Sequence, residues 1–171
     1  MSPLISETNN SFKWFILATA TFVTMLYAMN VTIASIALSD MRGAMGATQD
    51  QISWVVTGNI VATAIFTPFA GWLSSRIQIR TILFFSVIGF IISSIFCGMS
   101  DSLEEIVIAR VAQGIFGAPL PPLSQTLVLA VFPKRQISVA MAVWGMGTIL
   151  GPVIAPTTVS YTHLTLPTTR L

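Results

Sequence analysis

Five long stretches without a charged side chain constrain the fold of this 171-residue chain more than any other feature. They cover residues 14–39, 51–75, 81–100 and 111–133, and the fifth begins at residue 136. Each reaches or exceeds the roughly 20 apolar residues that cross about 30 Å of hydrocarbon. Only 8% of all residues are charged and 54% are hydrophobic, whereas about 25% are charged in an ordinary soluble domain. The sequence therefore predicts an all-α membrane protein with five transmembrane helices.

The basic residues predict how the spans are oriented, because cytoplasmic loops collect Lys and Arg. One set of alternate loops contains Lys13, Arg76, Arg80, Lys134 and Arg135. The other set contains Arg42 alone, together with five acidic residues. We therefore predict that residues 1–13 form a cytoplasmic amino-terminal tail. The first span is too long for the core of a cleavable signal peptide, so we expect it to remain as an anchor in the bilayer.

The reactive side chains that membrane-embedded enzymes and metalloproteins use are missing from the spans. No Asp or Glu lies well inside any apolar stretch, and the only histidine, His163, follows the last of the clear span sequence. The single cysteine, Cys97, excludes an internal disulfide and a cysteine metal cluster. We therefore expect no enzymatic activity, no metal, no cofactor and no nucleic-acid partner.

Small residues recur at helical spacing in the last two spans. Gly147, Gly151 and Ala155 follow one another at every fourth position, as do Gly114 and Ala118. Such faces let helix backbones approach closely in lipid. They serve either as contact surfaces alone or also in movement between helices, and the sequence leaves both interpretations open.

Arg110 is the one charged side chain predicted at membrane depth, and it permits two interpretations. The side chain could extend toward the outer surface, because it lies roughly 9 Å down a helix from the acidic loop. It could instead face the interior of the bundle and line a transport path, as charges within the membrane usually do.

Helical periodicity favours the interior position for Arg110. Small, polar and proline residues share its predicted face: Arg110, Gln113, Gly114, Gly117, Pro121, Ser124 and Gln125. Apolar residues lie on the opposite side, toward lipid: Val111, Ile115, Leu123 and Leu127. Three prolines, at 119, 121 and 122, should interrupt this span and favour a cavity beside the arginine.

Two other spans offer polar groups near this depth. Asn30 in the first span lies at a depth comparable to that of Arg110, so the two side chains could meet. Asn59, Thr63 and Thr67 form a stripe in the second span. Interhelical hydrogen bonding explains this stripe about as well as contact with a substrate.

Four motifs resemble the amino-terminal part of the major facilitator superfamily, and specifically its fourteen-span drug:proton antiporter branch, the EmrB-like proteins. "RVAQGIFGA" is similar to the fourth-span motif at Arg110, Gln113, Gly114 and Gly117. "GMGTILGPVIAP" is similar to the fifth-span antiporter motif at Gly147, Gly151 and Pro152. "GWLSSRIQIRTIL" resembles the cytoplasmic loop motif at Gly71, Leu73, Arg76 and Arg80. "MNVTIASIAL" stands where the first-span motif belongs, and the order of all four agrees.

The sequence departs from these motifs at several positions, and the departure at Asn30 is the one that concerns coupling. The family usually has an acid where this chain has Asn30, and another where it has Ser75. An amide does not release a proton in any accessible pH range. The resemblance therefore implies that a proton-coupling step at Asn30 has been lost or is performed elsewhere.

The resemblance implies a partial amino-terminal half of a major facilitator fold over residues 14–156. It implies a proton-coupled exporter of drugs or other amphipathic small molecules that works by alternating access when complete. Asn30, Arg110 and Gln113 become candidates for transport or coupling, with Arg110 tuning a nearby group. A bacterial inner membrane, a periplasmic adaptor and an outer-membrane channel follow by analogy with the family. A polytopic protein that only binds or scaffolds through its glycine faces is the alternative.

The composition changes at Thr157, where "TTVSYTHLTLPTTRL" begins. This segment is rich in threonine and resembles neither a continued span nor a familiar loop. We expect residues 157–171 to be a tail that is disordered or not native to the gene, and we assign no role to His163.

Overall fold

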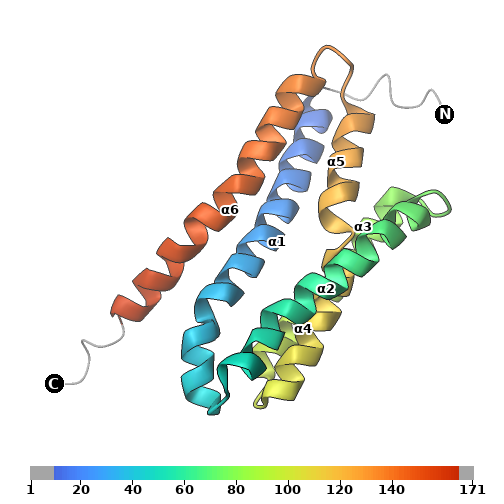
Figure 1. Ribbon diagram of the computed structural model, residues 1–171. Helices are drawn as coiled ribbons and strands as arrows, with labels where there is room; N and C mark the ends of the chain where they lie inside the picture. Colours follow the sequence, from blue (N-terminus) through green and yellow to red (C-terminus); the bar gives the residue numbers. More distant parts are fainter. Residues whose placement is uncertain (1–9, 166–171) are drawn as a thin grey trace.

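The computed structural model describes residues 10–165, with side chains described over residues 11–157 except at 39–40 and 44–45. All elements in this part of the chain are helices (Figure 1). They are α1 Asn10–Met45, α2 Gln49–Ser74, α3 Ile79–Met99, α4 Leu103–Gly117, α5 Leu120–Val131 and α6 Ile137–Thr165. Five helical segments within these residues are long and apolar enough to span a membrane, with α4 and α5 together forming one of them. The all-α fold and the five spans are thus confirmed.

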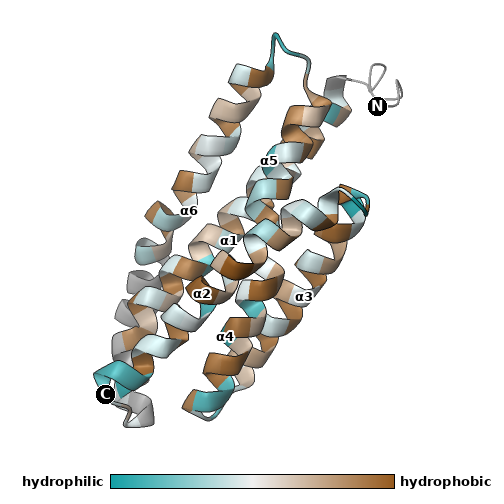
Figure 2. Cartoon of the chain, turned by 45° about the vertical axis from the view of Figure 1, so that its right-hand side comes forward, coloured by the Kyte–Doolittle hydropathy of each residue, from teal (hydrophilic) through white to brown (hydrophobic). Residues whose placement is uncertain are grey.

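The surface of the bundle is suited to lipid. Many large apolar side chains along the helices are exposed, among them Phe84, Phe85, Ile95 and Phe96 on α3. Hydrophilic residues gather at the loops and helix ends, whereas the helix shafts are mainly apolar or neutral (Figure 2). In water this apolar surface would be costly, but in a bilayer it faces a solvent as apolar as itself.

Local capping groups fix the two loops that the charge pattern places outside. Thr48 and Gln51 form a capping box at the start of α2, so each side chain satisfies a backbone N–H of the other residue. Ser102 caps α4 by accepting a hydrogen bond from the backbone of Glu105 at 3.3 Å. Gly46, with φ of 60°, provides the left-handed turn that ends α1.

The prolines of the fourth span divide it, as predicted. α4 ends at Gly117 and α5 begins at Leu120. Pro121 and Pro122 lie in the first turn of α5, where their missing N–H groups remove no intrahelical hydrogen bond. Beyond the break, Ser124 is buried, as predicted for the interior face, at 2% exposure. Leu123, expected toward lipid, is only 3% exposed.

Two close helix pairs organise the bundle. α6 packs along α1, and α2 packs along α4, with the members of each pair running in the same direction (Figure 1). Val111, also expected toward lipid, instead faces α2, where a Cβ added to Gly58 would lie 3.1 Å from its Cγ2 atom. That interface occupies the side of α4 that periodicity alone assigned to lipid.

α6 continues past Pro156 as far as Thr165. The predicted tail is therefore helical over its first part, whereas residues 166–171 and the side chain of His163 lie outside the described parts of the structure. The domain boundary at 156 and the foreign origin of the tail stay predictions.

Candidate functional site

Arg110 faces the interior of the bundle and contacts α1. Its Nη1 group donates hydrogen bonds to Oδ1 of Asn30 at 2.9 Å and to Oε1 of Gln113 at 2.8 Å. Helical spacing places Gln113 one turn after Arg110, on the same side of α4. The three residues predicted as transport or coupling candidates thus form one connected cluster.

Gln113 extends this cluster to α3. Its Nε2 atom donates to Oγ of Ser94 at 2.6 Å, and its side chain is only 1% exposed. One polar chain therefore joins α1, α4 and α3 through side chains alone. The sequence analysis missed Ser94, whose only signal is a pair of serines within a run of Ile and Phe.

The polar stripe of α2 holds α2 against the backbone of α4. Asn59 donates from Nδ2 to the carbonyl oxygen of Arg110 at 3.0 Å. Thr63 donates to the carbonyl oxygen of Gly114 at 3.4 Å, and its hydroxyl also lies 3.4 Å from the hydroxyl of Tyr27. Thr67 bonds within its own helix, to the carbonyl of Thr63. Two of the three stripe residues, Asn59 and Thr63, therefore form interhelical hydrogen bonds.

The glycines of the fourth-span motif permit this close approach. A Cβ added to Gly114 would lie 2.5 Å from the backbone oxygen of Asn59, and one added to Gly117 would lie 2.6 Å from the ring of Tyr27. Neither distance is one that real Cβ atoms adopt. Only glycine at these positions allows α2 and α1 to pack as they do against α4.

The glycines of the fifth-span motif have the same role between α6 and α1. A Cβ added to Gly151 would lie 2.6 Å from the backbone oxygen of Met25, and one added to Gly147 would overlap the side chain of Thr21. Pro152, next to Gly151, lies inside α6. The glycine face that could have bound another protein is thus occupied within the chain.

The residues of the cytoplasmic loop motif form a separate region. Gly71 and Leu73 lie near the end of α2, Arg76 follows it, and Arg80 lies in the first turn of α3. The guanidinium of Arg76 lies 5.0 Å from the ring centre of Trp72, a cation–π contact. None of these side chains hydrogen-bonds to the Arg110 cluster within the described residues.

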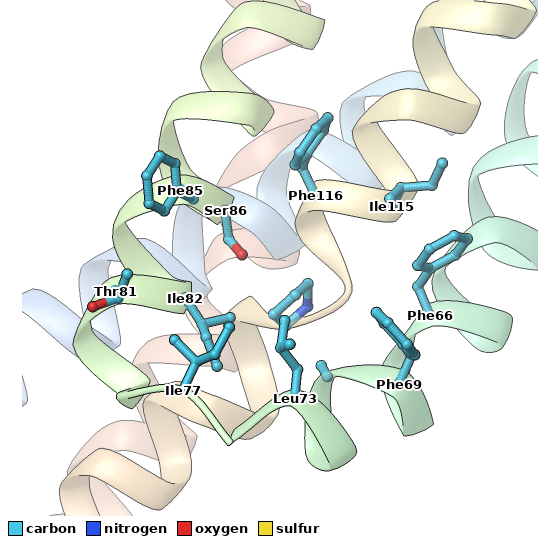
Figure 3. A pocket seen from close by; sticks show the side chains of 12 residues that line it. Phe66, Phe69, Leu73, Ile77, Thr81, Ile82, Phe85, Ser86, Ile115 and Phe116 are labelled. Atoms are coloured by element: carbon cyan, nitrogen blue, oxygen red, sulfur yellow. The ribbon is translucent and has the colours of Figure 1, made fainter. Parts of the chain in front are cut away.

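An apolar cavity of about 310 Å³ lies beside this loop, between α2, α3 and the break of the fourth span (Figure 3). Leu73, Phe66, Phe69, Phe85 and Phe116 point toward it. Its walls contain no charged side chain. It is thus distinct in chemistry from the cluster around Arg110.

The Arg110 cluster contains no acid. The six carboxylate side chains of the chain belong to Glu7, Asp40, Asp50, Asp101, Glu104 and Glu105. Asp50, Asp101, Glu104 and Glu105 lie in loops or first helix turns, whereas Glu7 and the side chain of Asp40 lie outside the described parts of the structure. The described residues include no ion pair with Arg110. The described residues also include no group of three side chains able to hold a metal ion. Within the described parts of the chain, Arg110 is therefore a cation held only by neutral oxygen atoms.

Comparison with known proteins gives a consistent picture. The family model described as Major Facilitator Superfamily matches residues 20–167. The multidrug export protein EmrB of Escherichia coli (strain K12) is 39% identical over 133 residues, which cover 78% of this chain and 26% of that protein. The fatty acid resistance protein FarB of Neisseria gonorrhoeae is 36% identical over 128 residues, which cover 75% of this chain and 25% of that protein.

The fold also matches a solved structure. A bacterial homolog of the human lysosomal transporter Spinster, inward-facing and unoccupied, gives a TM-score of 0.78 at 20% identity. The match covers 86% of this chain and 31% of that one. This chain spans about a quarter of the length of the curated relatives it matches.

Proposed function

Because this chain belongs to the major facilitator superfamily, we propose that its five spans serve in an exporter of drugs or other amphipathic small molecules. EmrB is named for multidrug export and FarB for fatty acid resistance, and both names fit amphipathic compounds. The observation that carries the proposal is the polar chain from Asn30 through Arg110 and Gln113 to Ser94. A half-buried cation within spans is typical of a transport path. The protein carries out no chemical reaction on its substrate.

The transport cycle is alternating access, in which two halves of a complete transporter rock about a central site. The close glycine contacts between α1 and α6 and between α2 and α4 support it, since they make rigid helix pairs that can move as units. The break between α4 and α5 adds a point at which the fourth span can bend.

Export is driven by protons, but Asn30 is not the residue that carries them. Its amide does not titrate, and no carboxylate lies next to Arg110 among the described residues. The proton-carrying group therefore belongs to other parts of the complete transporter. Arg110 contributes by holding α1 against α4, and Gln113 contributes by holding α3 against α4.

The protein is a multi-pass membrane protein, and its location is the bacterial inner membrane with the amino terminus in the cytoplasm. In a Gram-negative cell a periplasmic adaptor and an outer-membrane channel would complete the export route. A scaffold without transport draws less support, because Gly147 and Gly151 already pack against α1.

The test uses an intact exporter whose first five spans have this sequence, reconstituted in vesicles with a fluorescent amphipathic drug. Imposing a proton gradient should drive drug movement, and a protonophore should stop it. Movement that persists after the gradient is collapsed would overturn proton coupling, and no movement under any gradient would overturn export.

A further inference from the structure

The guanidinium of Arg110 has a hydrogen-bonding edge that the protein leaves unused. A guanidinium offers five N–H donors in a fixed plane. Nη1 bonds to Asn30 and Gln113. Nε is buried and has no hydrogen-bond partner among the described residues, and none of them accepts from Nη2. Nε and Nη2 together form one side of the plane, the side that binds a carboxylate through two parallel hydrogen bonds.

The charge of Arg110 also lacks a counter-ion among the described residues. Its two acceptors are amide oxygens, and no carboxylate among the described residues bonds to it. An unpaired cation with an unsatisfied donor is expensive in a low-dielectric bundle. A ligand that brings one negative charge and two oxygen atoms would remove both costs at once.

A small cavity adjoins this residue between α1 and α2. Its volume is about 10 Å³, and its walls are Val31, Ala34, Val55, Val56, Asn59 and Arg110. A space of roughly 10–15 Å³ holds one water-sized atom, which is also the size of a carboxylate oxygen. The surrounding valine and alanine side chains favour an apolar body next to that oxygen.

We propose that Arg110 is the headgroup subsite for amphipathic anions, and that its Nε and Nη2 edge binds the carboxylate of a single-chain substrate. The assignment rests on the proposed function and narrows its substrate class to monoanions. The apolar chain of the ligand lies among the spans, and α1 and α2 separate slightly to admit the headgroup. A cationic or neutral amphiphile of equal length gains nothing from this edge.

The experiment uses the 171-residue chain in phosphatidylcholine nanodiscs, which contain no anionic lipid. The probes are dodecanoate, dodecyltrimethylammonium and dodecanol, with binding measured above that of empty discs. Dodecanoate should bind saturably with a Kd at least about tenfold below those of the other two, as expected for a charge-assisted bidentate pair. Solid-state NMR of dodecanoate with a ¹³C carboxyl should detect a dipolar contact to a ¹⁵Nε of arginine.

Four variants locate the site. Arg110→Gln should abolish both the tighter binding of dodecanoate and the NMR contact. Arg110→Lys should keep part of the tighter binding of dodecanoate without the bidentate contact. Asn30→Asp should also weaken dodecanoate binding at least about tenfold, because it supplies a counter-ion from within the protein. Arg42→Gln removes an exposed cation that bonds to Gln49, and it should change nothing.

Equal affinity for the three probes, or a preference that survives Arg110→Gln, would overturn the assignment. Displacement of dodecanoate by added phosphatidylglycerol would also overturn it, because the edge would then belong to a lipid phosphate. If the exporter moves cationic drugs and Arg110 does not favour binding of dodecanoate, the carboxylate subsite is refuted and the proposed export stands. Anion binding in a protein that moves no solute refutes the proposed export instead.

Discussion

Arg110 on α4 and Asn30 on α1 share a hydrogen bond of 2.9 Å although they lie 80 positions apart in the chain. The bond connects the first span to the fourth, which α2 and α3 separate in sequence. Because the acceptor is a neutral amide, it holds the guanidinium without cancelling its charge. The contact explains how so apolar a bundle accommodates an arginine and keeps its charge available.

Arg110 should be required for export. In an intact exporter with these five spans, Arg110→Gln should lower the initial rate of drug export at least about tenfold, since it removes the charge and several donors. Arg110→Lys should retain part of the rate. Vesicle flux assays measure both, with Arg42→Gln as the matched control for loss of one positive charge. Equal rates for Arg110→Gln and Arg42→Gln would contradict the prediction.

Gly114→Ala should weaken the contact between α2 and α4. Its new Cβ would lie 2.5 Å from the backbone oxygen of Asn59, so one helix must shift. We expect a loss of about 1–3 kcal/mol in the free energy of unfolding, measured by denaturant titration in micelles. Gly98→Ala is the control, because nothing lies within 4 Å of its Cβ. A similar loss in both variants would exclude the close contact as the cause.

Gly151→Ala should impair export through the pairing of α6 with α1. The added Cβ would lie 2.6 Å from the backbone oxygen of Met25. The export rate should fall at least about tenfold, which corresponds to roughly 1.4 kcal/mol at the limiting step. Gly145→Ala on the same helix, with open space around its Cβ, should export normally. Export unchanged by Gly151→Ala would show that this interface does not limit the cycle.

The predicted orientation can be checked by cysteine labelling. In a Cys97→Ser background, Ser75→Cys should react with an impermeant maleimide only after the membrane is opened. Asp101→Cys should react in intact spheroplasts, because the charge pattern places its loop outside. Both native residues are exposed, so access to the side chain is not limited by packing. The reverse pattern would invert the assigned topology.

Much of this architecture is encoded in composition and spacing. Uncharged runs predicted the five spans, and periodicity predicted that Arg110 faces the bundle interior with Gln113 beside it. The predicted lipid-facing side was wrong at Val111, which faces α2, and at Leu123, which is buried. The contact of Ser94 with Gln113 could not be foreseen, since it depends on which turn of α3 lies opposite α4. The predicted orientation makes α1 and α6 run in the same direction, but no local pattern predicts that these two helices pack together.

The contact between Asn30 and Arg110 is tested most directly by a double-mutant cycle on the free energy of unfolding. Asn30→Ala, Arg110→Ala and the double variant of the 171-residue chain would be compared in micelles. A direct, partly buried hydrogen bond predicts a coupling energy of roughly 0.5–3 kcal/mol between the two positions. Additive effects, with a coupling energy near zero, would contradict the contact and with it the placement of Arg110 inside the bundle.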